Sequence, residues 1–84
     1  MKLRQENVSS RKIDGEIVVL DLTSSQYFTV AGSGVILYER LASGATEDEL
    51  VAAMLAEYAV DPHVARADVV AFVQKLTDAG LVES

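Results

Sequence analysis

The chain has 84 residues, of which half are apolar, and its formal net charge at pH 7 is −6. This length provides one modest hydrophobic core, and the apolar content indicates a folded chain rather than a disordered acidic one. Because there is no cysteine, disulfides, thiol nucleophiles and cysteine-ligated zinc are excluded. No apolar run approaches the roughly 20 residues that span a bilayer, and residues 1–8 lack the apolar stretch of a signal peptide. We therefore expect one domain, residues 1–84, in the cytoplasm and without membrane contact.

The charge is unevenly distributed along the chain. Residues 1–12 contain four basic residues and one acidic residue, so the rest of the chain carries a net charge of −9. The basic residues beyond this segment are scattered singly, at Arg40, Arg66 and Lys75. A domain this acidic repels a phosphate backbone unless one face concentrates its cations. The charge distribution therefore disfavours binding to nucleic acid.

Three strands are predicted in the first part of the chain. Asp14-Gly15 is a two-residue hairpin signal with strand-like sequence on both sides. The first strand, about residues 7–13, is polar enough for a sheet edge, whereas residues 16–21 form the nearly continuous apolar run of a central strand. After a polar turn, residues 26–30 form a third strand. These segments predict a three-stranded antiparallel meander.

Two short helices are predicted next. Ser33 is expected to cap a helix that runs to about Leu41. Thr46 and Glu49 have the spacing of a capping box, which begins a second helix that runs to about Tyr58. The residues of the second helix expected to face the core are Leu50, Met54 and Leu55.

A third helix is expected between Asp61-Pro62, as N-cap and first helical residue, and Gly80. One broad face carries its core residues, Ala65, Val69, Phe72, Val73, Leu76 and Ala79. Further apolar residues fall outside that face, namely Val64, Ala67, Val70 and Ala71. They indicate either a groove beside the helix or a few exposed valines and alanines without function. Strands followed by three helices on one side predict an α+β fold; the winged-helix-like form of that fold is an expectation from the family resemblance described below.

No segment has the pattern of a catalytic, cofactor or metal site. His63 is the only histidine and has no second ligand nearby in the sequence. The acidic residues 47–49 fan around a helix start, where they offset the helix dipole, instead of converging on a metal. Residues 32–34 lack the lysine and the longer glycine spacing of a phosphate-binding loop. We therefore expect a protein that is not an enzyme and that holds neither cofactor nor metal.

The order and spacing of three segments, 18–41, 46–50 and 68–72, resemble the PqqD-like family, the RiPP recognition elements. The resemblance covers roughly residues 13–82. It implies a small winged-helix domain that holds the leader segment of a precursor peptide while separate enzymes modify or cut the peptide. The chain departs from the family pattern after the third strand, where Val30-Ala31 replaces the usual Leu-Asn pair. Ser33 is therefore expected to serve as the missing cap.

The resemblance also implies where a leader binds. Exposed N–H and C=O groups on the edge of the third strand would recruit the leader as a further strand, and the third helix would form the other wall. On the resemblance, Asp68 is a contact for a polar group of the leader; the alternative is an exposed acid making weak pairs on the helix surface. The predicted peptide-binding residues are Gln26, Tyr27, Phe28, Thr29, Val30, Val64, Asp68, Val69, Ala71, Phe72, Lys75 and Leu76.

Among the branches of the family, the chain is most similar to the leader-binding protein of lasso peptide clusters. That similarity implies two partner enzymes: a leader peptidase of the transglutaminase-like cysteine protease type, and a lasso cyclase. Three alternatives stay open from the sequence. They are a PqqD-type peptide chaperone for a radical SAM enzyme, a winged-helix DNA-binding regulator, and a dimerisation module that uses the same sheet edge.

Overall fold

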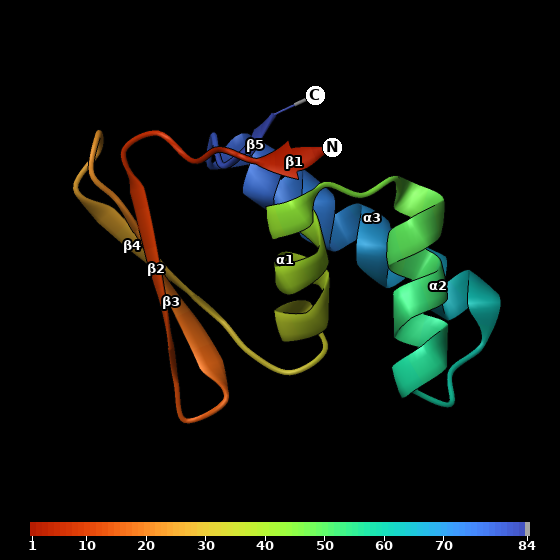
Figure 1. Cartoon of the computed structure of the whole chain (residues 1–84). Helices are drawn as coiled ribbons and strands as arrows, with labels where there is room; N and C mark the ends of the chain where they lie inside the picture. The colour runs from red at the N-terminus through yellow and green to blue at the C-terminus, as the bar shows by residue number, and fades with distance from the viewer. Residues whose placement is uncertain (84) are drawn as a thin grey trace.

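The computed structural model describes residues 1–83, and its elements form two layers, with a sheet on one side and helices on the other (Figure 1). The elements in chain order are β1 (Lys2–Leu3), β2 (Val8–Ile13), β3 (Glu16–Asp21), β4 (Gln26–Val30), α1 (Gly34–Ser43), α2 (Glu47–Glu57), α3 (Pro62–Asp78) and β5 (Val82–Glu83). The three-stranded sheet has the order β2-β3-β4 and is antiparallel throughout. The predicted α+β fold, with its meander and three helices, is confirmed.

The meander begins with the predicted two-residue hairpin. Asp14 and Gly15 have φ of 52° and 80°, as a type I′ turn requires, and Ile13 is paired with Glu16 across them. The inward residues of β3 are buried and the outward ones are more exposed, so the strand alternates rather than being covered on both faces. Because the strand order is β2-β3-β4, the outer strands β2 and β4 each have one edge that no neighbouring strand covers.

Local side-chain chemistry fixes the starts of two helices. Thr46 accepts a hydrogen bond from the Glu49 N–H at 3.1 Å, and the Glu49 carboxylate accepts one from the Thr46 N–H at 2.9 Å. Asp61 accepts a hydrogen bond from the His63 N–H at 2.8 Å, and Pro62 is the first helical residue. Both predicted caps are confirmed.

The prediction that Ser33 caps α1 through its side chain is wrong. Ser33 has helical backbone angles, and its side chain makes no capping hydrogen bond. The N–H groups of Gly34 and Val35 instead donate to Ala31 and Gly32 carbonyls in tight turns. The backbone supplies the cap, because the chain already coils before α1 begins.

One core joins the sheet to the helices. Its members come from the inner face of the sheet, from all three helices, from β1 and from the segments just before α2 and β5: Leu3, Ile17, Val19, Val30, Leu37, Tyr38, Leu41, Ala45, Leu50, Val51, Met54, Ala65, Val69, Leu76 and Leu81. Of the residues predicted to point inward from α2, Leu50 and Met54 are buried, but Leu55 is 38% exposed. Val51 and Ala53 are buried in its place, because the apolar stripe of α2 faces α1 and α3 at a slightly different angle.

The sequence did not indicate the two-stranded ribbon β1–β5, which joins the two ends of the described chain. Arg4 follows β1 and bridges two parts of the fold. Its guanidinium donates to Asp21 at 2.7 Å, at the end of β3, and to the Gly80 carbonyl at 3.1 Å, just after α3. Arg4 therefore ties the central strand of the sheet to the C-terminal end of α3.

The Asp21 carboxyl is 4% exposed and also accepts a hydrogen bond from the Thr23 N–H at 3.0 Å. Burial raises the pKa of Asp21, but the Thr23 N–H and the Arg4 guanidinium outweigh this effect, so its pKa lies below the ordinary value of an aspartic acid. A group with a lowered pKa in the folded state stabilises the fold above its unfolded pKa, about 3.9, and loses that contribution as the pH falls through the folded value.

We predict that Asp21→Asn lowers the free energy of unfolding at pH 7 and flattens the loss of stability in acid. Urea unfolding at a series of pH values between about 7 and 2 measures both effects. Glu49, whose pKa is lowered mainly by the hydrogen bond from the Thr46 N–H, titrates in both proteins, so the difference between them isolates Asp21. Parallel stability curves for the two proteins over this range would contradict the role given to Asp21.

Candidate functional site

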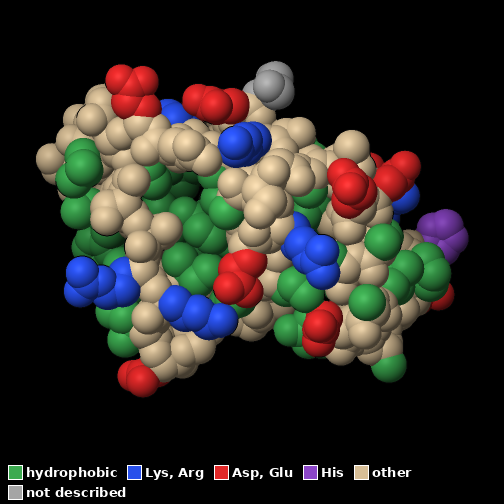
Figure 2. Space-filling view, viewed as in Figure 1, with side chains coloured by type: hydrophobic (Ala, Val, Ile, Leu, Met, Phe, Trp, Pro, Cys, Tyr) green, Lys and Arg blue, Asp and Glu red, His purple; other side chains and the backbone are tan. Residues whose placement is uncertain are grey.

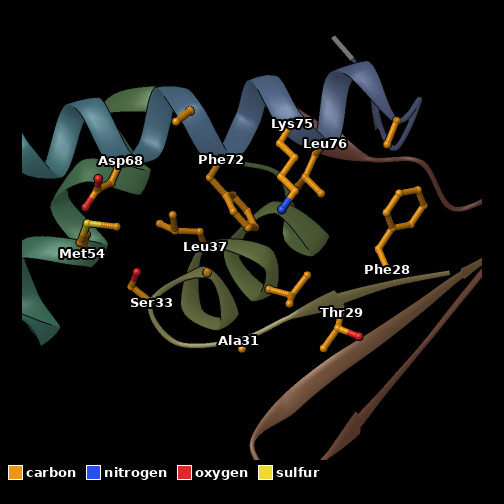
Figure 3. Close-up of a pocket in the computed structure, with 14 residues that line it drawn as sticks. Phe28, Thr29, Ala31, Ser33, Leu37, Met54, Asp68, Phe72, Lys75 and Leu76 are labelled. Atoms are coloured by element: carbon orange, nitrogen blue, oxygen red, sulfur yellow. The ribbon is translucent and has the colours of Figure 1, made fainter.

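A hollow lies between β4 and α3, and α1 contributes to its floor (Figure 3). It has a volume of about 400 Å³. Its lining residues are Phe28, Thr29, Val30, Ala31, Ser33, Gly34, Leu37, Met54, Asp68, Ala71, Phe72, Lys75, Leu76 and Ala79. We call this hollow the β4–α3 groove. Its middle is apolar, and its size can hold one or two large side chains of an extended chain.

One wall of the groove is an open sheet edge, and the register shows which main-chain groups are free. The two residues that flank a two-residue hairpin loop exchange both of their main-chain hydrogen bonds, so Glu16 bonds to Ile13 of β2. In an antiparallel pair, every second residue bonds to the same neighbour, so Val18 and Leu20 also bond to β2. The Leu22 N–H, which donates to Asn7 at 2.8 Å, follows the same alternation. The intervening residues of β3 therefore bond to β4.

On β4, this alternation leaves two residues whose main-chain N–H and C=O groups do not bond to β3. Phe28 and Val30 are paired with β3 residues whose N–H and C=O groups point to β4, whereas Tyr27 and Thr29 alternate with them. The main-chain N–H and C=O groups of Tyr27 and Thr29 are thus directed outward from the edge. An extended chain laid along β4 would find two such residues, and their four main-chain groups, available for hydrogen bonds.

Two charged residues of α3 stand over the groove. Asp68 lies near one end and Lys75 extends its amine over the middle, while Phe28 closes the opposite end (Figure 3). Neither Asp68 nor Lys75 forms an ion pair within residues 1–83. Both charges are solvated in the free protein and are available to charged or polar groups of a ligand.

The structure brings most of the predicted site residues together in this groove. Those that line it are Phe28, Thr29, Val30, Asp68, Ala71, Phe72, Lys75 and Leu76. Gln26 and Tyr27 lie on the same strand beyond the groove, and Val64 is 50% exposed one helical turn before Asp68. Val69 is completely buried in the core, so its side chain supports α3 from behind and does not line the groove. Contact with a peptide is a prediction for all of them.

Six lining residues were not among the predicted ones: Ala31, Ser33, Gly34, Leu37, Met54 and Ala79. Leu37 and Met54 have core-facing positions on their own helices, and nothing in helical periodicity distinguishes a core side chain from one at the bottom of a groove. Ala31, Ser33 and Gly34 form the strand-to-helix turn, which passes under the groove. Only the packing of α1 against α3 brings these residues to the site.

The rest of the described surface offers smaller hollows and no constellation of reactive groups. Between β2 and α1, two hollows of about 160 and 210 Å³ have apolar floors and charged side chains around them (Figure 2). Within residues 1–83, no three acidic or histidine side chains converge as metal ligands would. Over the same residues, no helix has both the length and the apolar character needed to cross a membrane.

Comparison with solved structures finds two close matches. TbiB1 in complex with the TbiA(beta) leader peptide has a TM-score of 0.91 and 33% sequence identity, over 100% of this chain and 96% of that one. Lasso peptide synthetase B1 complexed with the leader peptide has a TM-score of 0.86 and 25% identity, over 99% of this chain and 96% of that one.

Comparison with curated protein sequences gives no match. The sequence profile of the family described as coenzyme PQQ synthesis protein D (PqqD) matches residues 16–82, which include β3, β4, the three helices and every residue that lines the β4–α3 groove. The predicted family is confirmed: the chain belongs to the PqqD family.

Proposed function

We propose that this protein binds the leader segment of a ribosomally made precursor peptide in the β4–α3 groove, as a strand added to β4. The observation that carries the proposal is the groove itself, which has a free sheet edge on one wall and apolar side chains between the walls. The two similar solved structures both contain leader peptides, which supports the same ligand class here. Strand addition uses backbone bonds for affinity and side-chain pockets for specificity.

The energetics of such a complex are those of a moderately tight peptide. Each large apolar side chain that the peptide buries contributes about 1.5–3 kcal/mol. Hydrogen bonds to Tyr27 and Thr29 each add about 1 kcal/mol net, because both partners give up water. Association and the ordering of a flexible peptide oppose these terms by several kcal/mol or more. The balance corresponds to dissociation constants between the micromolar and nanomolar ranges.

The role we propose is non-catalytic. Asp68 and Lys75 are the only titratable residues that line the groove, and neither stands in a hydrogen-bonded pair with a nucleophile. The protein would instead hold the leader so that the core of the precursor reaches separate enzymes at raised effective concentration. By the lasso peptide analogy, these enzymes are a leader peptidase of the transglutaminase-like type and a lasso cyclase.

A winged-helix DNA-binding role has less support. It requires basic side chains of α3 that are free to meet phosphates. Arg66 is instead held by Glu47 and Asp48 of α2, and the remaining cation of α3, Lys75, lies over the groove. Acidic residues thus surround the helix that would have to enter a DNA groove.

The first prediction for this function concerns salt. A leader peptide encoded beside this gene, or the TbiA(beta) leader, should bind with an affinity that changes less than about tenfold between about 50 and 200 mM salt, because apolar anchors and backbone bonds dominate. Isothermal titration calorimetry at each salt concentration measures this. A loss of about 10³-fold or more would indicate phosphate contacts and a nucleic-acid ligand. Absence of binding by both leaders would contradict the proposed function.

The second prediction separates the two edges of the sheet. Thr29→Pro removes an outward N–H from β4. Ser10→Pro is the matched control, because it removes an outward N–H from β2. Ser10 is paired with Val19 at a position where the two residues do not bond across the β2–β3 ladder. We expect both variants to fold, as shown by circular dichroism. Thr29→Pro should weaken leader binding at least tenfold, or about 1.4 kcal/mol. Equal binding by the two variants would place the peptide elsewhere.

The third prediction concerns charge over the groove. Asp68→Ala and Lys75→Ala should each leave stability nearly unchanged, because both side chains are exposed and unpaired within residues 1–83. At least one should weaken leader binding by about 1.5–3 kcal/mol, the value of a charged hydrogen bond. Asp78→Ala removes the same charge from α3 outside the groove and serves as the control. Parent-like affinity for both groove variants would rule out a charged contact with the leader.

A further inference from the structure

Gly34, the first residue of α1, is a glycine that its backbone conformation does not require. The glycines with positive φ in this chain are Gly15, Gly32, Gly44 and Gly80, and Gly34 is not among them. An L-residue with a side chain can adopt such a backbone without strain. Alanine is moreover the better helix former, because glycine loses more conformational freedom on folding. A different constraint must therefore account for glycine at this position.

That constraint is the aromatic ring of Phe72. A Cβ atom at Gly34 would lie 2.9 Å from Phe72 Cε1 and 3.1 Å from Val30 Cγ1. The first distance is far inside van der Waals contact, so one of the atoms has to move. Val30 is buried in the sheet and paired with Ile17, whereas Phe72 is only half-buried and ends in a ring that can rotate. The ring of Phe72 is the group that would yield.

The direction in which the ring can move is set by its surroundings. Phe72 projects from α3 toward Leu37 of α1, next to Leu76, and the open groove lies on its remaining side (Figure 3). Leu37 and Leu76 are both buried, at 1% and 4% exposure. A ring displaced by a side chain at position 34 therefore enters the groove and occupies space that the parent keeps open.

We propose that Gly34 is a positioning residue that sets the depth of the β4–α3 groove, by letting the Phe72 ring lie against the first turn of α1. The space this leaves takes a large apolar side chain of the bound peptide. An apolar side chain is selected because the inner lining of the groove includes Leu37, Met54 and the Phe72 ring, while Asp68 and Lys75 stand at its rim. The ligand part of this inference rests on the proposed function.

The test is Gly34→Ala, in which binding and stability should change in opposite directions. The variant should fold and unfold in urea at the parent's midpoint or a higher one, because alanine favours the helix and the ring can move. Its affinity for the leader that the parent binds should fall at least tenfold. If affinity falls only in proportion to a loss of stability, Gly34 has a merely structural role and the proposal is overturned.

Phe72→Leu supplies the second arm. Leucine lacks the Cε1 atom that an alanine at position 34 would meet at 2.9 Å. In the Phe72→Leu background, Gly34→Ala should therefore change leader affinity less than threefold. A variant of the leader gives a parallel test. When the largest apolar side chain of the leader is replaced by alanine, the affinity of that leader should be the same for the parent and for Gly34→Ala. A full tenfold loss in either background would show that the alanine acts by some route other than the ring.

A readout that needs no peptide keeps this inference distinct from the proposed function. In the parent, nuclear Overhauser effects should join the Phe72 ring protons to the Gly34 α-protons. In Gly34→Ala, the ring protons should show new contacts to Thr29 of β4, across the groove. If no leader binds the parent but the ring moves as stated, the proposed function fails and the assignment of groove depth stands. A ring that stays in place in Gly34→Ala overturns the assignment, whatever the leader does.

Discussion

The walls of the β4–α3 groove, strand β4 and helix α3, are held apart by contacts that lie outside the groove. Arg4 supplies one of the constraints, since its guanidinium joins Asp21 at the end of β3 to the Gly80 carbonyl after α3. The pair is charge-assisted and lies where the carboxyl is almost completely buried, so it is held more rigidly than a surface ion pair. The other constraint is α1, whose buried residues fill the space below the groove. A sheet edge and a helix are thus kept apart on the two sides of the groove.

This arrangement leaves part of the domain's own bonding incomplete. The outward main-chain groups of Tyr27 and Thr29 bond only to water in the free protein, and Phe28 and Phe72 are only half-buried. An uncovered sheet edge is also a risk, because it can pair with other chains. The position of α3 over the groove limits which chains can reach β4, since an added strand must also fit beneath the helix. The same geometry therefore hinders flat edge-to-edge association.

The parts of the fold that the sequence predicted are those set by neighbours in the chain. The Asp14-Gly15 turn and the Thr46 capping box depend on residues two or three positions apart, and both are found as expected. The ribbon β1–β5 could not be predicted in this way, because Leu3 pairs with Val82 across nearly the whole chain and neither strand exceeds two residues.

The candidate site likewise has parts that local sequence predicts and parts that depend on contacts between distant residues. The sequence identified the strand and the helix that form the walls, but helical periodicity could not separate Val69, which faces the core, from Phe72, which faces the groove one turn away. In the sequence, residues 32–34 lack the pattern of a phosphate-binding loop, and nothing there indicates a role for Gly34 in the groove. Its role appears only when α3 has packed against α1, because the atom it must avoid is 38 positions further along the chain. The depth that we propose for the groove depends on a contact that secondary structure does not determine, which is why the walls were predictable and the depth between them was not.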